Sequence, residues 1–531
     1  MENVNSLNSE VKTQEAAEVK HMLELTVGSQ NLVSVVNTLD TVKADSVLFY
    51  PTKNERTCEE NGKTVYKRWF QVSKSGTVMA AAAMLEASVR VFGYDGEKAV
   101  KLAKVGVSDM KVIFSAKELL ELSNCISGLD TQVRFAINTT DSTCTVDINA
   151  GKKDGVISAI NMLPLKKEAV RFDLGGKPLG GAVLKPYTLL RMNDAVRNMT
   201  ADAQPNLRGI HIGFGGPGLK WFATNERMVT LGEVPECELS PAPVEKLVCI
   251  EKDAFDKAAH FCQKAAKCQI QLIGKETKKQ VSGKIEYTEG MEQTGKVTEG
   301  PDGKRYMEVI SEETETVPNH IAFTAAFADG SQATLTVQLH DPNHTGGFST
   351  SVFENFKRRL RADDTAFEEE EGVKARASFL FDRDELILAL NLMKISGAFK
   401  GLVQFGLENG SKEIMIKEYS KENTGRVAHG KIRGNVSVPV GLKMPCVFVT
   451  KQLTALLNVL HLKELTDENG KVTGREKVRA YVKDSIVSFT GGGDNTYVGV
   501  TVMRARDIDA ALSAEETKKE EETASSEEKA E

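Results

Sequence analysis

Two glycine clusters are the first residues in this sequence whose type and spacing could bind a phosphate. The cluster Gly213-Phe-Gly-Gly-Pro-Gly218 lacks the Lys-Ser/Thr ending of a phosphate-binding loop. It also joins two strand-like segments, RGIHIGF and LKWFATN, where a phosphate loop would join a strand to a helix. Glycine and proline between two such segments favour a hairpin turn. The cluster at 491–495 (GGGDN) has the same interpretation.

Histidine and cysteine offer little for metal binding or catalysis. His340 and His344 flank a proline in a loop, and no further ligand type is spaced near them, so an exposed turn is expected. Cys262 and Cys268 are predicted to lie on one helix, where a separation of six puts them on different faces, and to be ordinary buried thiols. The eight cysteines include no C-x-x-C pair. No nucleophile is spaced with a base, so we expect neither an enzyme nor a metal or cofactor.

Basic residues recur on the predicted helices. Alone, they indicate solvated helix faces; the alternative is a diffuse positive surface for nucleic-acid phosphates. Their recurrence along the chain favours the second interpretation. The candidate DNA-binding residues are Lys117, Lys185, Arg191, Arg197, Lys252, Lys257, Lys264, Lys267, Lys394 and Lys451.

A strand–helix–strands unit positions these residues and recurs along the chain. Three copies are clear, at 111–137, 246–274 and 445–490, and a looser copy precedes each of them. The helices carry apolar residues at i, i+3 or i+4, and the returning strands alternate in polarity. We therefore predict an α+β protein of three domains, each built from two units. Repetition at this scale is a property of the fold.

Composition shifts mark the domain boundaries. We predict disordered tails at 1–20 and 509–531, domains at 21–170, 171–361 and 373–508, an acidic linker at 362–372 and a hairpin insertion at about 275–319. The net charge is −6, but segments 363–371 and 512–531 carry −6 and −5, which leaves a mildly basic body. No run of apolar residues approaches membrane-spanning length, and the polar N-terminus does not resemble a signal peptide. A cytoplasmic protein is expected.

Four segments follow recognisable sequence patterns. Leu219–Val229, which comes after the strand-like 206–214, follows L-x-x-V-A-T-D-G-x-R-L, with Asn225-Glu226 in place of Asp-Gly. Residues 353–360 follow F-P-D-Y-x-R-V-L, 497–504 follow a closing Y-x-V-M-P-M-R, and 114–122 form a strand-to-helix entry. In these segments the chain resembles the β subunit of bacterial DNA polymerase III, the replicative sliding clamp. Glu354 and Val502 replace the family's prolines, so the chain is expected to be a divergent bacterial or phage member.

The resemblance implies a head-to-tail homodimeric ring, with sheets outside and helices lining a hole that encloses duplex DNA. Such a ring acts as the processivity factor of a DNA polymerase and is loaded by a clamp loader. Partners of the family insert a peptide into an apolar pocket between the second and third domains. Matched position by position, that pocket comprises Leu207, Thr224, Arg227, Met228, Arg358, Val502 and Met503.

Two other classes of function stay open on the sequence. A clamp-fold scaffold without a ring would bind replication or repair proteins through the same pocket. A nucleotide-binding enzyme would use the glycine turns. The mass of the native particle separates the first from a ring, and binding assays with nucleotides and metals separate the second.

Overall fold

We describe the fold from a computed structural model of the chain. It describes residues 20–60, 62–95, 98–100, 111–138, 142–148, 156–163, 176–197, 199–200, 207–215, 218–234, 238–239, 247–328, 330–339, 350–360, 377–395, 401–406, 408, 410–419, 428–437, 446–460, 462–468, 470–483, 486–491 and 496–501. The chain forms two compact units: 1–174 with 324–336, and 175–323 with 337–531. No helix in the described ranges is long and apolar enough to cross a membrane.

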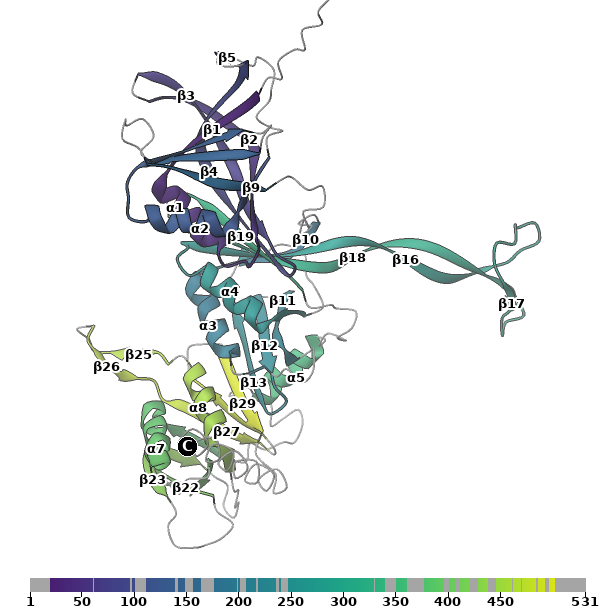
Figure 1. Ribbon diagram of the computed structural model, residues 1–531. Helices are drawn as coiled ribbons and strands as arrows, with labels where there is room; N and C mark the ends of the chain where they lie inside the picture. Colours follow the sequence, from purple (N-terminus) through teal and green to yellow (C-terminus); the bar gives the residue numbers. More distant parts are fainter. Residues whose placement is uncertain are drawn as a thin grey trace, which may run out of the picture. The chain divides into compact units, whose positions relative to one another are not determined.

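The first unit is a cycle of antiparallel strands with two helices (Figure 1). Strand β1 pairs with both β4 and β7, so the cycle β1-β7-β8-β9-β6-β2-β3-β4 closes on itself. Strand β19 also pairs with β4. The elements are β1 (Lys20–Gly28), α1 (Ser29–Leu39), β2 (Ser46–Glu60), β3 (Lys63–Ser75), β4 (Met79–Asp95), β5 (Lys98–Val100), β6 (Val112–Ser115), α2 (Ala116–Ile126), β7 (Gln132–Asn138), β8 (Thr143–Ile148), β9 (Val156–Leu163) and β19 (Gln332–Gln338).

The second unit begins with one set of strands and helices that repeats this order. Strands β14, β10, β16 and β18 lie side by side, and β15, β11, β12 and β13 form part of another sheet. The elements are β10 (Lys177–Leu184), α3 (Pro186–Val196), β11 (Gly209–Gly215), β12 (Gly218–Thr224), β13 (Met228–Val234), β14 (Glu238–Leu239), β15 (Val248–Glu251), α4 (Lys252–Phe261), β16 (Lys267–Glu286), β17 (Val297–Glu299), β18 (Arg305–Ala326) and α5 (Thr350–Leu360).

The rest of the second unit extends that sheet. Strand β29 pairs with β13, and the order continues β28-β27-β20-β23-β22-β21-β24. Thus one continuous sheet joins the middle of the chain to its end. The elements are β20 (Ala377–Phe381), α7 (Arg383–Ile395), β21 (Leu402–Gly406), β22 (Glu413–Glu418), β23 (His429–Ser437), β24 (Cys446–Val449), α8 (Thr450–Val459), β25 (Glu464–Thr466), β26 (Val472–Arg475), β27 (Val478–Lys483), β28 (Ile486–Thr490) and β29 (Thr496–Thr501).

All six predicted strand–helix–strands units are present. Each helix follows a strand directly, and local residues explain several helix starts. The Ser115 hydroxyl accepts a hydrogen bond from the Glu118 amide at the start of α2, and Pro186 occupies the first turn of α3. The Asp382 carboxylate accepts the amides of Asp384 and Glu385, the second and third residues of α7. The apolar positions predicted on helices and returning strands are buried, among them Leu119, Val133, Ile270, Leu453 and Val478.

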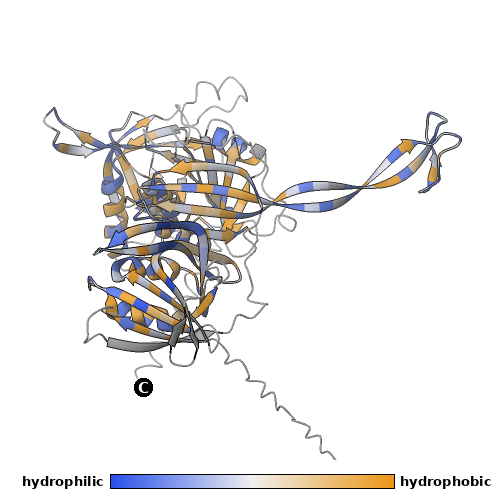
Figure 2. Cartoon of the chain, turned by 90° about the horizontal axis from the view of Figure 1, so that it is seen from above, coloured by the Kyte–Doolittle hydropathy of each residue, from blue (hydrophilic) through white to orange (hydrophobic). Residues whose placement is uncertain are grey.

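Two polar insertions are hairpins. Strands β16 and β18 form a long antiparallel ribbon that extends beyond the sheet at its base, and β17 pairs with β18 near its tip (Figures 1 and 2). The ion pairs Lys278–Glu312 and Lys304–Glu286 cross between its strands. The insertion near Asp467 is the smaller hairpin of β25 and β26.

The first glycine cluster is a strand connection, as predicted. Gly215 of β11 is the register partner of Gly218 of β12, so the cluster joins two antiparallel neighbours. Strands β28 and β29, on either side of the second cluster, pair in the same way. The residues between them, the His340–His344 segment, the acidic linker and the predicted tails up to residue 19 and from 509 lie outside the described residues.

Candidate nucleic-acid interface and partner site

The six unit helices pack in pairs, and the pairs of the second unit touch each other. Helix α1 packs on α2, α3 on α4, and α7 on α8, while α3 also contacts α8. The Asn193 amide of α3 donates to the Asp256 carboxylate of α4 at 2.7 Å, which fixes one pair. In the second unit the four helices therefore form a contiguous layer.

The ten candidate DNA-binding residues lie mainly on or beside these helices. Six of the ten lie within helices, Lys185 and Arg197 cap the two ends of α3, and Lys264 and Lys267 follow α4. Because α4 ends at Phe261, Lys264 lies in the following turn and Lys267 begins β16, which corrects the prediction that all ten are helical. Seven side chains are exposed, and the three partly buried ones are Arg191, Lys252 and Lys257.

Several of these lysines stand at helix starts. Lys185 is the N-cap of α3, Lys252 begins α4, and Lys117 and Lys451 are second residues of α2 and α8. The first turns of α3 and α8 carry no acidic residue. A cation there opposes the positive end of the helix dipole and costs ~0.3–1 kcal/mol. This arrangement lowers stability but concentrates positive charge where helix N–H groups already attract anions.

Arg191 is held differently from the lysines. Its guanidinium lies over the Tyr187 ring, 5.3 Å from the ring centroid, and the ring itself is exposed. Burial lowers the pKa of Arg191, but from so high a value that it stays charged at neutral pH. The pair therefore presents a rigid cation beside an aromatic surface. Tyr187 was not among the predicted contact residues, although its position four residues before Arg191 on a predicted helix indicates that the two side chains share a face.

The predicted peptide pocket is centred on the turn between β12 and β13. The Thr224 hydroxyl donates to the Met228 carbonyl at 2.8 Å and accepts the Glu226 amide at 3.2 Å. The Asn225 carboxamide oxygen accepts the amides of Arg227 and Met228. Glu226 adopts φ 71°, a left-handed conformation that glycine adopts more easily. The Asp-Gly of the resembling pattern occupies this same position.

The other predicted pocket residues divide by exposure. Leu207, Thr224 and Met228 are buried, whereas Arg227 and Arg358 are exposed. Val502 and Met503 lie outside the described residues. Met228 is the register partner of Val500 on β29, so the described chain reaches the turn just before those two residues.

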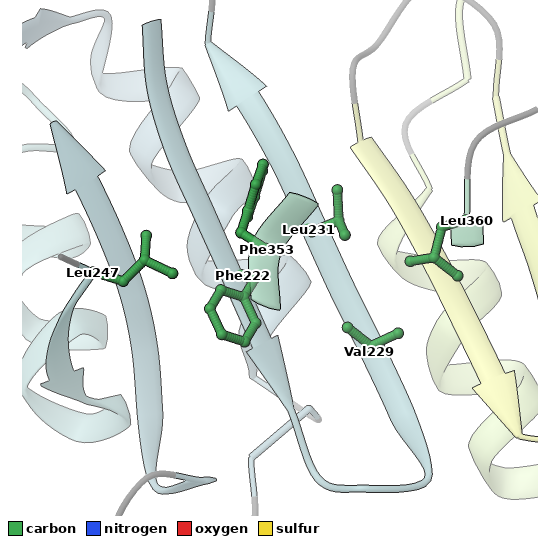
Figure 3. Close-up of a cluster of buried hydrophobic side chains, with 6 residues drawn as sticks. All are labelled: Phe222, Val229, Leu231, Leu247, Phe353 and Leu360. Carbon is green, nitrogen blue, oxygen red and sulfur yellow. The ribbon is translucent and has the colours of Figure 1, made fainter. Parts of the chain in front are cut away.

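Helix α5 carries Arg358 and is anchored to the sheet by aromatic packing. Phe353 and Leu360 are buried in a cluster with Phe222, Val229 and Leu231, which Figure 3 shows on β12 and β13. Lys220 pairs with Glu354 and Lys357 with Glu233, and since Lys220 and Glu233 are register partners, both ion pairs hold α5 at the same point of the sheet. Leu360 packs so close to Gly499 of β29 that a Cβ there would lie 2.4 Å from its Cδ2. Residues 353–360 carried part of the resemblance to clamps, but the helix they form was not predicted from the sequence.

No family model and no curated protein matches the sequence. Solved structures do. A β sliding clamp from Caulobacter crescentus matches at 13% identity and TM-score 0.54, over 91% of this chain and 100% of that one. The DNA polymerase III β subunit from Pseudomonas aeruginosa matches at 13% and 0.56, and a putative β subunit from Eubacterium rectale at 10% and 0.55, with the same coverage. The fold is that of the bacterial sliding clamp.

The clamp fold accounts for the repetition observed here. The match covers 100% of a solved example and 91% of this chain. At 10–14% identity the likeness establishes the fold and leaves the sites to be argued from this chain. Among the described residues, no three His, Cys, Asp or Glu side chains come together as metal ligands.

Proposed function

We propose that this chain is a non-enzymatic DNA sliding clamp: a head-to-tail homodimeric ring that encloses duplex DNA and tethers a DNA polymerase. We further propose three clamp domains at 21–170, 171–361 and 373–508. The observation that supports the ring is a pattern of strand pairing that repeats in each domain. In its third copy, one strand edge has no partner among the described strands.

This pattern concerns the third strand after the first helix of each domain. After α1 that strand is β4, which pairs with both β1 and β19. After α3 it is β13, which pairs with β29, and its continuation β14 pairs with β10. Thus one part of each strand pairs within its own domain, and another part pairs with the last strand of the next domain.

Among the described strands, the third copy, β23, pairs only with strands of its own domain. Residues 434–437 pair with β20, as the pattern requires. Residues 429–433 pair with β22 on one edge, and no described strand pairs with the other edge. There the Arg433 amide donates to the Glu385 carboxylate of α7 at 3.2 Å. A sheet edge of this kind is a template for another strand.

The strand that the pattern supplies is β9 of a second copy. When the insertion strands β17, β25 and β26 are left out, β19 and β29 are the third strands after α4 and α8, and β9 is the third strand after α2. β9 pairs with β8 at residues 156–161 and with β6 only at Met162 and Leu163. Its remaining edge, at 156–161, fits the edge of β23. Two such contacts related by a twofold axis close a ring.

An apolar stripe on α7 supports the same interface. Leu388, Leu392 and Ile395 are 59%, 57% and 78% exposed, although the opposite side of α7 buries Leu386, Leu390 and Met393. At spacings of four and three residues the exposed side chains share one face. Helix α3 contacts α8 at the junction between domains two and three. By the same repetition, α7 would contact α2 of the second copy, which would cover this stripe.

The positive side chains on and beside the helices are suited to binding duplex DNA without regard to its base sequence. Lysines at helix starts and the Arg191–Tyr187 pair give dispersed positive charge, which attracts phosphates without fixing a register. Polymerase and clamp loader would dock at the β12–β13 turn, between Arg227, Arg358 and the apolar Leu207 and Met228. The buried Leu and Met with Arg at the rim fit a peptide with apolar anchors.

The test combines mass with topology. The wild-type chain should sediment as a dimer near twice 58.0 kDa. After loading by its cognate loader it should remain on nicked circular DNA through gel filtration, and leave when the DNA is linearised. Dissociation from both forms alike would refute encirclement.

Proline substitutions test the strand itself. The Arg433 amide points to the vacant edge and the Gly434 amide to Lys412 beside β22, so amides alternate and that of Lys431 points to the vacant edge. Lys431→Pro should therefore leave the monomer folded and abolish the dimer. Ile432→Pro, whose amide points into the ladder, is the control and should unfold the domain. A dimeric Lys431→Pro variant would place the interface elsewhere.

The scaffold without a ring remains a second candidate for the same fold. The exposed α7 stripe and the vacant β23 edge favour the ring, because a monomeric scaffold would leave both uncovered. A monomer that still binds polymerase peptides would support the scaffold.

A further inference from the structure

Cys262 and Cys268 lie together in the interior of the second unit. Their Sγ atoms are 2.7 Å apart, and both side chains are 0% exposed. Cys262 is the C-cap of α4, and Cys268 is the second residue of β16. The prediction that both occupy one helix is therefore wrong, while their burial agrees with the expectation from the sequence.

A tight turn sets this separation. The Gln263 amide donates to the His260 carbonyl and the Ala265 amide to the Cys262 carbonyl, which ends the helix and reverses the chain. Cys268 then enters β16, where it is the register partner of Leu184 on β10. Both ends of the turn are thus held by regular structure. The two sulfurs are only about 0.7 Å farther apart than the ~2.05 Å of a disulfide bond.

The other buried thiols of the described chain offer a contrast. Cys144 and Cys249 are also buried, but neither has a second sulfur within bonding distance among the described residues. The Cys144 thiol instead faces the Thr145 carbonyl at 3.8 Å. The close thiol pair is therefore a specific feature of the turn after α4.

We propose that Cys262 and Cys268 form a dithiol that a peroxide converts into an intramolecular disulfide. The Cys262 sulfur attacks one peroxide oxygen, the O–O bond breaks, and the first water leaves as Cys262 becomes a sulfenic acid. The Cys268 sulfur then attacks the Cys262 sulfur, and the second water leaves with the Cys268 proton. Two thiols and one hydrogen peroxide thus give one disulfide and two waters.

The geometry orders the two steps. The hydrogen bond with Cys262, together with burial, raises the pKa of Cys268, so that thiol keeps its proton at neutral pH. Cys268 is also held within β16 against β10, whereas Cys262 lies at the end of α4 beside the turn, so Cys262 makes the first attack. Gln263 and Lys264 beside it are exposed, so local opening of the turn admits a small oxidant. A buried pair of this kind should oxidise slowly.

The disulfide would close a loop from Cys262 to Cys268 that contains Lys264 and Lys267. It would restrict the turn that carries two candidate DNA contacts. Any effect on DNA retention rests on the proposed clamp function, whereas formation of the bond does not.

Peptide mapping tests the bond directly. The full-length protein is treated with hydrogen peroxide, denatured with excess alkylating agent and digested with trypsin. Cleavage at the lysines separates peptide 258–264 from peptide 268–275, so the disulfide appears as a linked pair that reductant separates. We expect this pair to accumulate with its mass lower by two hydrogen atoms than that of the free peptides.

Matched variants complete the test. Cys125→Ser, which removes an exposed thiol, should leave the linked pair unchanged. Cys268→Ala and Cys262→Ala should each abolish it, and either one suffices if the other does not fold. The proposal would be overturned if both cysteines are fully alkylated after peroxide treatment. In that experiment a native circular dichroism spectrum must show that the protein is folded, and oxidised Cys125 must show that the peroxide was active. If the pair forms but oxidised and reduced proteins stay on circular DNA equally, the bond stands and its effect on DNA is refuted.

Discussion

The substitution Leu392→Ser should weaken the proposed dimer by removing one apolar side chain from its interface. Leu392 lies in the middle of α7 and is 57% exposed. Burying a whole Leu side chain is worth ~1.5–3 kcal/mol, so covering the exposed part contributes ~0.9–1.7 kcal/mol per interface. A head-to-tail dimer contains two such interfaces, which doubles the effect to ~1.7–3.4 kcal/mol. At about 1.4 kcal/mol per factor of ten, the dimer dissociation constant should rise roughly 15- to 300-fold.

Sedimentation equilibrium over a range of protein concentrations measures this constant. Ile310→Ser is the matched control, because Ile310 is 68% exposed on β18 and belongs to no proposed interface. The control should dimerise like the wild type, and circular dichroism should show both variants folded. Equal dissociation constants for Leu392→Ser and the wild type would refute the role given to α7. So would a weakening of the dimer in the Ile310→Ser control as large as that in Leu392→Ser.

Four further predictions concern the helix-start lysines, the β12–β13 turn and a buried thiol. The double variant Lys185→Glu, Lys451→Glu should weaken non-specific DNA binding. The slope of log K against log salt concentration, measured by titration at several salt concentrations, should fall by about 0.9 for each phosphate that is no longer neutralised. An unchanged slope would show that these residues do not contact DNA. The same double variant should melt no lower than the wild type, because both lysines oppose helix dipoles. Glu226→Gly should stabilise the second unit by about 0.5–1 kcal/mol in urea unfolding, since φ 71° strains glutamate; a destabilised variant would contradict this. Burial raises the pKa of Cys249 to about 12, so its thiol stays protonated at any pH well below 12. Iodoacetamide at about pH 8 should therefore label the exposed Cys125 but not Cys249 in native protein. Equal labelling of the two would show that Cys249 is accessible.

The sequence was sufficient to predict the six helices and their returning strands because periodicity is local. Val133, Phe135 and Ile137 alternate, and each is buried as expected. The pairing of β13 with β29 could not be predicted locally, since it joins residues about 270 positions apart. Only the resemblance to clamps anticipated that the end of the chain returns to its middle.

Local propensity also placed one helix end wrongly. Residues 263–267, Gln-Lys-Ala-Ala-Lys, are good helix formers, which favoured a helix through Cys268. In the structure α4 ends at Phe261, because Cys268, Ile270 and Leu272 are needed in β16 against β10. Tertiary pairing overrode propensity at that point. The close approach of Cys262 and Cys268 is possible because α4 ends at Phe261, so the helix propensity of this segment could not predict it.

The first unit has a consequence for the order of events during synthesis. It contains 324–336, a segment about 150 residues beyond the end of its main part at Leu174. At ~5–20 residues per second, a ribosome needs on the order of 10–30 s to supply that segment after the main part has been made. Through this interval the edge of β4 that later pairs with β19 lacks its strand. A nascent chain paused within the β16–β18 ribbon would therefore present that edge to other chains, and chaperone capture should be strongest there.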